Sequence, residues 1–190
     1  MKARFLLLLL AVAPAAASAC SDLLEHRYRP LSGKVADSLC AQFEGKVLLI
    51  VNTASKCGYT PQYEGLEALH QRLQSRGFAV LGFPSNDFMG QEPGTEKEIQ
   101  EFCTLTYGVK FPMFEKVKVK GDEATPLYQQ LARETGTEPG WNFHKYLVDR
   151  EGKVVASFPT RTTPDDAELL ARIETLLAAP SSTPEAKKTP

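Results

Sequence analysis

The sequence predicts an α/β fold with a central mixed sheet flanked by helices, and three observations support this. Unbroken apolar runs at 47–51 and 78–83 predict two buried strands. Leucines at helical spacing within 61–76 predict an amphipathic helix between them, and a strand-helix-strand unit of this kind joins parallel strands. A hairpin expected within 146–158 adds antiparallel strands, so the sheet should be mixed.

The amino terminus has the pattern of a secretory signal peptide. Lys2 and Arg4 precede an apolar run at 5–13, and small residues at 17–19 form a cleavage site. The apolar run is too short to span a bilayer comfortably. We therefore expect residues 1–19 to be removed and the mature protein to be exported, to a bacterial periplasm.

The four cysteines of an exported chain invite pairing. Cys20 and Cys40 both precede the first core strand, so a structural disulfide between them would hold down the amino-terminal segment. The alternative is a free or lipid-modified Cys20, as in a bacterial lipoprotein, with Cys40 as a small buried side chain. Ala17 stands where a lipoprotein signal usually has leucine. The two uses of the Cys20 sulfur exclude each other.

Length and charge limit the organisation and the partners. The chain has 190 residues and a net charge of −1, which suits one folded domain at 20–178. Residues 179–190 are rich in proline, serine and lysine and should form a disordered tail. No basic block stands out, so we expect no nucleic-acid partner.

The loop after the second strand and the helix beyond it carry clear local signals. Residues 85–94 have the composition of a loop at the carboxyl end of a strand, where ligands bind in open α/β sheets. Thr95 can cap a helix at 95–106, because Glu98 completes a capping box. Cys103 lies in the last part of this helix.

The rest of the chain alternates extended and helical segments. We expect an extended segment at 111–120, a helix at 125–134, strands at 146–148 and 154–158, and a helix at 164–177. Pro126 suits the first turn of its helix, and residues 149–152 have the composition of a hairpin turn.

Cys57 is the residue most clearly placed for chemistry. It stands where the first strand gives way to the helix, and backbone N–H groups at a helix entrance favour a thiolate. The run Cys57-Gly58-Tyr59-Thr60 resembles the C-x-x-C turn of thioredoxin-like proteins, with Thr60 in place of the second cysteine. A partner sulfur must then come from elsewhere in the chain.

Three sequence blocks carry a family resemblance. They are N-T-A-S-K-C-G-Y-T-P-Q-Y at 52–63, F-P-S-N-D-F-M-G-Q-E-P-G at 83–94 and W-N-F-H-K-Y-L-V-D-R at 141–150. In this order and with these separations they resemble the signature blocks of glutathione peroxidases, and the similarity extends over about 31–177. The resemblance implies a thioredoxin fold and a peroxidase that uses no metal and no cofactor.

The resemblance also implies a catalytic group, whose matching positions here are Cys57, Gln91, Trp141 and Asn142. The indole N–H of Trp141 and the amides of Gln91 and Asn142 are uncharged hydrogen-bond donors. They can stabilise a thiolate and the oxygen that leaves as a peroxide is cleaved. Taken singly, each has a simpler explanation as a core aromatic, a loop residue or a turn former.

Attack of Cys57 on a peroxide leaves a sulfenic acid, which a second thiol must resolve. Cys103 in E-F-C-T-L-T-Y-G matches the resolving cysteine of the thioredoxin-dependent branch, although it could also be a merely packed thiol. The resemblance implies a disulfide between Cys57 and Cys103, reduced by a thioredoxin-like protein or by glutathione. We expect the helix that holds Cys103 to unwind locally to deliver it.

Departures from the family pattern narrow these expectations. Ser85 stands where many relatives have a cysteine, which leaves Cys103 as the resolving candidate, and Asp87 stands at a frequent glutamine position. Residues 136–140 lack the insertion through which animal tetramers associate, so we expect a monomer with an open site. No arginine cluster offers a grip on the carboxylates of glutathione, which favours a thioredoxin-like reductant.

The sequence is compatible with two classes of function. The leading one is a thiol peroxidase that reduces hydrogen peroxide or organic and lipid hydroperoxides. The alternative is a thiol-disulfide exchange or redox-sensing protein, in which Cys57 and Cys103 pass oxidation to a client. A purely structural binding module would not need Cys57 at all.

Overall fold

The structure is a computed structural model that describes residues 20–179. Residues 1–19, where we expect a signal peptide, and residues 180–190 of the expected tail lie outside the described residues, so both expectations stay predictions.

The central sheet has four strands in the order β4-β3-β5-β6. Their bounds are Val47–Thr53 for β3, Phe78–Pro84 for β4, Lys145–Val148 for β5 and Val154–Phe158 for β6. The pair β3 and β4 is parallel, whereas β5 runs antiparallel to both β3 and β6. The predicted mixed sheet, its parallel unit and its hairpin are therefore confirmed.

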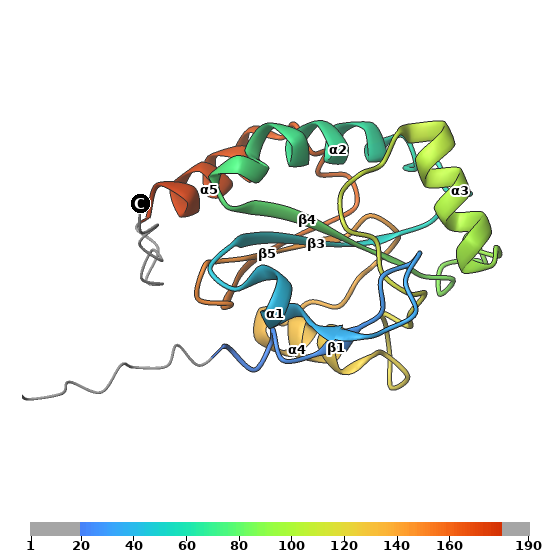
Figure 1. Cartoon of the computed structure of the whole chain (residues 1–190), viewed down its shortest axis with the longest axis horizontal. Helices are drawn as coiled ribbons and strands as arrows, with labels where there is room; N and C mark the ends of the chain where they lie inside the picture. The colour runs from blue at the N-terminus through green and yellow to red at the C-terminus, as the bar shows by residue number, and fades with distance from the viewer. Residues whose placement is uncertain (1–19, 180–190) are drawn as a thin grey trace, which may run out of the picture.

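Helices cover both faces of the sheet (Figure 1). Helices α2 (Gln62–Leu73) and α5 (Ala167–Ala178) lie on one face, and α4 (Pro126–Thr135) lies on the other with α1 (Leu39–Phe43). A short 3-10 turn, Gln74–Arg76, extends α2. Within the described part of the chain, no helix is long and apolar enough to cross a membrane.

The alternation of side chains along β3 explains how one strand serves two cores. Val47, Leu49 and Val51 belong to the apolar cluster under α2 and α5. Leu48 and Ile50 belong to the cluster on the side of α1 and α4. Successive side chains of a strand point to opposite faces, so an unbroken apolar run is the pattern of a strand buried on both sides.

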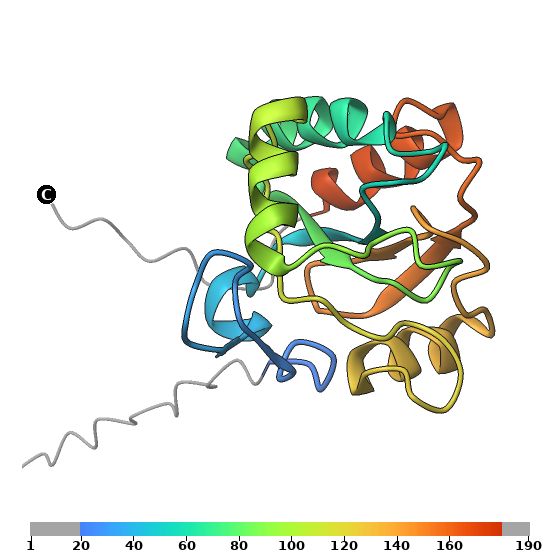
Figure 2. The ribbon, with the colours of Figure 1, turned by 90° about the vertical axis from the view of Figure 1, so that its right-hand side faces the viewer.

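Helix α3 (Glu96–Tyr107) stands at one end of the sheet, across the direction of α2 (Figures 1 and 2). The predicted capping box is present, because the Thr95 side chain accepts from the Glu98 backbone N–H and the Glu98 side chain accepts from the Thr95 backbone N–H. At its other end Gly108 adopts a left-handed conformation with φ of 61°. Both ends of this helix are therefore closed by local hydrogen bonds.

Three short elements near the amino terminus were not predicted. They are β1 (Arg27–Tyr28), β2 (Asp37–Ser38) and α1. Elements of two to five residues show no hydrophobic period, so sequence patterns do not reveal them. The structure joins Cys20 to Cys40 in a disulfide within this segment.

Two predicted boundaries differ from the structure. The segment expected to be extended at 111–120 forms only isolated bridges at Met113 and Phe114, and Pro112 has no N–H to extend a ladder. Helix α5 begins at Ala167 rather than at Pro164, because the Asp166 carboxylate accepts the N–H groups of the first turn and fixes the start there.

Candidate active site

Cys57 lies in a tight turn between β3 and α2 and is 9% exposed. Its backbone N–H donates to Thr60 Oγ1 at 3.0 Å, and the Thr60 hydroxyl donates to the Ala54 carbonyl at 2.9 Å. Thr60, at the position of the second cysteine of a C-x-x-C turn, thus acts as a structural clamp. Its two hydrogen bonds hold the cysteine loop in one conformation.

The Cys57 sulfur accepts the backbone N–H of Tyr59 at 3.4 Å. Helix α2 begins at Gln62 with Pro61 as its cap, as the sequence predicted to within one residue, and the sulfur lies in the turn that leads into the helix. The predicted support from backbone N–H groups is present, but the turn supplies it.

Gln91 and Asn142 meet beside this turn. The Asn142 amide donates to Gln91 Oε1 at 2.9 Å, and the Lys56 backbone N–H donates to the Gln91 carbonyl at 3.0 Å. Because its oxygen is occupied, the Gln91 side chain keeps its NH₂ group free as a donor. Asn142 is fully buried, so this orientation is set inside the protein.

Trp141 is half-buried and packs against the apolar cluster that contains Cys57. Its ring lies 5.5 Å from that of Phe88, measured between centroids, and Asn52 Nδ2 donates to its carbonyl at 3.1 Å. Phe143 follows with a φ of 62°, rare for a side chain of this size. Its N–H donates to the Asn52 carbonyl at 2.7 Å, which helps to hold the strained backbone.

Cys103 is fully buried in α3 and is a free thiol, as is Cys57. Burial raises the pKa of Cys103 to about 11; Tyr63 opposes this shift and the charge of Glu92 adds to it. The N–H groups of Gly108 and Val109 donate to the Cys103 carbonyl, so the helix is intact around it. The structure therefore shows both cysteines as free thiols, with α3 intact around Cys103.

Two buried charged residues near the site were not predicted. Glu92 is fully buried, and burial raises its pKa to about 7. Lys145 is also fully buried, and burial lowers its pKa to about 7. Its ammonium donates to Gln62 Oε1 at 2.6 Å and to the Phe143 carbonyl at 2.7 Å. Glu92 and Lys145 both lie in the matched family blocks. Charged residues are rarely buried, however, and the composition gave no sign that these two would be.

The positions that depart from the family pattern have structural roles here. Asp87 accepts the Val119 N–H at 2.7 Å and pairs with Lys118 at 3.2 Å. Ser85 is buried, and its hydroxyl accepts the Asp87 N–H at 3.4 Å. These contacts fasten the loop that carries Gln91 to the segment before α4.

One group of possible metal ligands occurs among residues 20–179. The ligand atoms of Cys20, Glu25 and Cys40 lie within 4.8 Å of one another. Both sulfurs are consumed by the disulfide, so the group lacks the thiolates that would bind a metal.

Comparison with known proteins decides the family. A family model described as glutathione peroxidase matches residues 25–132. The chain belongs to the glutathione peroxidase family. The resemblance seen in the three blocks is confirmed, and the enzyme is a glutathione peroxidase-like peroxidase that reduces hydroperoxides.

Curated relatives of this glutathione peroxidase include proteins from Synechocystis and Escherichia coli. A Synechocystis protein named hydroperoxy fatty acid reductase gpx1 is 54% identical over 148 residues. The match covers 71% of this chain and 85% of the Synechocystis protein. The Escherichia coli protein named thioredoxin/glutathione peroxidase BtuE is 45% identical over 161 residues. This match covers 72% of this chain and 88% of the Escherichia coli protein.

Solved structures confirm the thioredoxin fold of this glutathione peroxidase. The apo crystal structure of a protein named Trgpx has a TM-score of 0.67 and 32% identity, and covers 85% of this chain and 99% of its own. The T. cruzi GPX1 structure has a TM-score of 0.64 and 31% identity, covering 83% and 97%. A thioredoxin family protein from Chlorobium tepidum, at 16% identity and a TM-score of 0.60, shares the fold alone.

Proposed function

We propose that Cys57 is the peroxidatic cysteine of this peroxidase and that Cys103 resolves its oxidised form. The observation that carries the proposal is the link between the Cys57 turn and the Gln91–Asn142 pair. The Lys56 N–H holds the Gln91 main chain beside the cysteine, and Asn142 orients the Gln91 amide. A preorganised set of neutral donors is suited to stabilising developing negative charge without reorganisation.

The first step is a nucleophilic displacement on oxygen. The Cys57 thiolate forms a bond to the outer peroxide oxygen, the O–O bond breaks, and the alcohol or water leaves after taking up a proton. Cys57 becomes a sulfenic acid, oxidised by two electrons, while the hydroperoxide is reduced. The N–H of Tyr59 and the amide of Gln91 supply donors to the sulfur and to the leaving oxygen.

In the second step the Cys103 sulfur attacks the sulfenic sulfur of Cys57, an S–S bond forms and water leaves. Cys103 is buried in an intact helix, so the last turns of α3 must unwind to bring the two sulfurs to the spacing of a disulfide. A dithiol protein of the thioredoxin kind then reduces the disulfide. The name of the Escherichia coli relative includes both thioredoxin and glutathione, which supports testing both reductants.

Bulky lipid hydroperoxides are the substrate class that we favour beside hydrogen peroxide. The name of the Synechocystis relative states a reaction with hydroperoxy fatty acids. The connection from Gly136 to β5 is short, which supports an open approach and a monomeric enzyme.

Export to an oxidising compartment is part of the same proposal. The Cys20–Cys40 disulfide supports it, since such bonds persist outside the cytoplasm. While both sulfurs form this bond, Cys20 cannot carry a lipid. Intact mass analysis of the mature protein reads the cleavage site and the disulfide together, and a mature chain beginning with an acylated Cys20 would contradict this part.

Separate substitution of the two cysteines tests the mechanism. With thioredoxin, its reductase and hydrogen peroxide or a fatty acid hydroperoxide, Cys57→Ser should lose turnover by at least about a thousandfold, because the nucleophile is gone. Cys103→Ser should consume one equivalent of peroxide and then stall, and Cys20→Ser/Cys40→Ser is the control.

Two results would contradict the mechanism. Full thioredoxin-dependent turnover by Cys103→Ser would remove its resolving role. Stoichiometric mixed disulfides with client proteins, without steady consumption of peroxide, would instead favour the thiol-disulfide exchange protein.

A further inference from the structure

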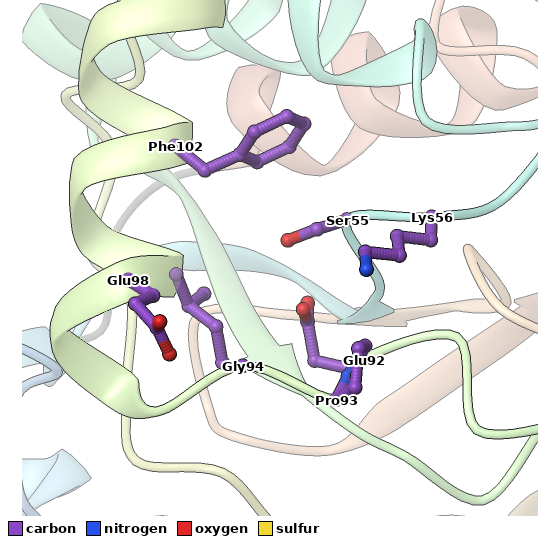
Figure 3. Close-up of a pocket in the computed structure, with 8 residues that line it drawn as sticks. Ser55, Lys56, Glu92, Pro93, Gly94, Glu98 and Phe102 are labelled. Carbon is purple, nitrogen blue, oxygen red and sulfur yellow. The ribbon is translucent and has the colours of Figure 1, made fainter.

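A cavity of about 390 Å³ lies between the segments that carry the two redox cysteines (Figure 3). It is lined by Ser55, Lys56, Glu92, Pro93, Gly94, Glu98, Ile99 and Phe102. Ser55 and Lys56 directly precede Cys57, and Phe102 directly precedes Cys103. Figure 3 shows the Phe102 ring, the Ser55 hydroxyl and the Glu92 carboxyl around one space. The cavity therefore adjoins both the Cys57 turn and the part of α3 that holds Cys103.

Glu92 is the unusual residue of this cavity. Its side chain is fully buried, and its carboxyl faces the hydroxyl and the backbone N–H of Ser55. Its main chain is held at both ends, because its N–H donates to Asn86 Oδ1 at 2.8 Å and its carbonyl accepts the Lys116 ammonium at 2.9 Å. A fully buried carboxyl is costly even with such partners, so its presence calls for a functional explanation.

The surroundings of Glu92 connect it to both cysteines. On the side of α3 its charge acts on Cys103 and on Tyr63, which faces Cys103. On the opposite side it faces Ser55 and Lys56. In the described part of the chain, no other carboxylate has a charge that acts on Cys103. Glu92 is therefore a carboxyl group that interacts with the peroxidatic turn on one side and with the resolving thiol on the other.

We propose that Glu92 is the proton-transfer group of the resolving step, which takes the proton of the Cys103 thiol and delivers it to the hydroxide leaving Cys57. This inference rests on the proposed function, since it requires Cys103 to be the resolving cysteine. It adds a base to a site whose other polar side chains, Gln91, Asn142 and Trp141, are neutral.

The step balances without any further reactant. The ionised Glu92 carboxylate accepts the Cys103 proton, and the resulting thiolate forms a bond to the Cys57 sulfur. The S–O bond of the sulfenic acid breaks, and its hydroxide takes the proton back from Glu92 to leave as water. The Cys103 thiolate supplies the electron pair of the new S–S bond, the pair of the S–O bond leaves with the hydroxide, and Glu92 ends as it began.

The acid-base strengths of the two groups fit this role. Burial raises the pKa of Glu92 to about 7, so the carboxyl both accepts and releases a proton near neutral pH. Burial raises the pKa of Cys103 to about 11, so a thiolate forms only rarely without a base. A positioned general base contributes roughly a hundredfold to ten-thousandfold in rate.

Charged and titratable groups surround Glu92 from each neighbouring segment, and they set its ionisation. They are Lys56 in the cysteine turn, Tyr63 on α2, Cys103 and Glu98 on α3, and Lys116 before α4. Hydrogen bonds from Ser55 and the charges of the two lysines lower the pKa of Glu92, but together by less than burial raises it. The base form of Glu92 should therefore prevail only above about pH 7.

Single-turnover kinetics of Glu92→Gln test the proposal. The reduced enzyme is mixed with one equivalent of hydrogen peroxide, and samples are quenched with dimedone or an alkylating agent and weighed by mass spectrometry. This separates formation of the Cys57 sulfenic acid from closure of the Cys57–Cys103 disulfide. We expect Glu92→Gln to form the sulfenic acid within about threefold of the wild-type rate and to close the disulfide about a hundredfold more slowly.

The pH profile supplies a second, independent measurement. Disulfide closure in the wild-type enzyme should slow below a midpoint near pH 7, where Glu92 becomes protonated. In Glu92→Gln this midpoint should disappear, and the rate should rise steadily toward the pKa of the thiol. The normal sulfenic-acid step shows that the variant is folded.

Glu98→Gln is the matched control. Glu98 lines the same cavity, but its carboxyl is exposed and turned to Thr95, and glutamine preserves the capping box. This variant should close the disulfide at the wild-type rate. In the Cys103→Ser background, with a small dithiol as the resolving thiol, Glu92→Gln should have no further effect, because the buried thiol is absent.

Two outcomes would overturn the inference and are distinct from failure of the proposed function. One is disulfide closure in Glu92→Gln within about threefold of wild type, and the other is a wild-type closure rate that does not change between pH 5.5 and 8.5. If Cys103→Ser itself turns over normally with thioredoxin, the resolving assignment fails first.

Discussion

The buried Asn142 fixes the orientation of the Gln91 side chain through one hydrogen bond. Asn142 is fully buried, and its NH₂ group donates to the oxygen of Gln91 at 2.9 Å. A glutamine amide can present either end to a substrate, and this contact commits its NH₂ end to the site. A loop residue thereby becomes a preorganised donor, which is what stabilisation of a leaving oxygen requires.

Lys145 offers the clearest electrostatic prediction at the residue scale. Burial lowers its pKa from 10.5 to about 7. Between these pH values the unfolded chain carries a proton on this side chain that the folded chain lacks, so this group makes the free energy of unfolding rise with pH. We expect Lys145→Met to remove a rise of about 2 kcal/mol between pH 7 and 9.

Urea unfolding, followed by the fluorescence of the single tryptophan, measures this effect at several pH values. Lys153→Met, which removes an exposed lysine beside the same hairpin, is the control. The explanation is wrong if the wild-type and Lys145→Met proteins show parallel pH dependence in this window.

The catalytic candidates and the buried charges differ in how far the sequence reveals them. Cys57, Gln91 and Asn142 stand in blocks specific enough to be recognised, and the fold brings them beside one turn. Glu92 stands in the same block, but a loop rich in turn residues predicts solvent exposure. Glu92 is buried where this loop meets α3 and the Cys57 turn, and no local pattern encodes such long-range contacts.

At the scale of the element, helices α3 and α5 show which helix boundaries the sequence can predict. Its start was predictable, because Thr95 and Glu98 form a capping box that depends on four consecutive residues. The start of α5 was misjudged, because Pro164 and Asp166 both suit a helix start and the carboxylate of Asp166 binds the N–H groups of Glu168 and Leu169. When two nearby residues both suit a helix start, the hydrogen bonds formed in the folded protein decide between them. The sequence alone does not show which of those bonds will form.

Unwinding of α3 yields a prediction for its last turn. Gly108 has a φ of 61°, and its N–H donates to the carbonyls of Cys103 and Thr104. A Cβ there would meet nothing within 4 Å, so Gly108→Ala adds backbone strain alone, at about 1 kcal/mol. Weakening the turn that holds Cys103 should speed disulfide closure by about fivefold after one equivalent of peroxide.

Gly136→Ala is a closely matched control for this helix. Gly136 ends α4 with a φ of 69° and likewise has nothing within 4 Å of an added Cβ. Both variants should lose similar stability, but only Gly108→Ala should change the closure rate in quenched single-turnover samples. Equal rates in the two variants would mean that α3 need not unwind.

At the scale of the whole molecule, the amino-terminal segment completes one of the two cores. Tyr28, Leu39 and Phe43 pack in the cluster that includes Leu48 and Ile50 of β3. Figure 1 shows α1 and β1 on the same side of the sheet as α4. Cys57 belongs to the cluster on the opposite face. The segment thus supports the sheet from the side away from the chemistry.

The Cys20–Cys40 disulfide should therefore matter for stability and not for catalysis. It closes a loop between cysteines 20 positions apart, and the loss of freedom that it imposes on the unfolded chain is worth about 3 kcal/mol. We expect Cys20→Ser/Cys40→Ser to lose about this amount in the free energy of unfolding, measured by urea titration. Formation of the Cys57 sulfenic acid should keep its wild-type rate, because both sulfurs pack against the other core cluster.

Reduction of the wild-type protein by a small dithiol provides the control for this substitution. If the bond acts by closing the loop, the reduced wild-type protein should unfold at the same urea concentration as the double serine variant, and the oxidised protein should unfold at a higher one. A difference below about 1 kcal/mol would show that α1 and β1 hold the segment by packing alone. A slower peroxide step in the variant would show instead that the two faces of the sheet are coupled.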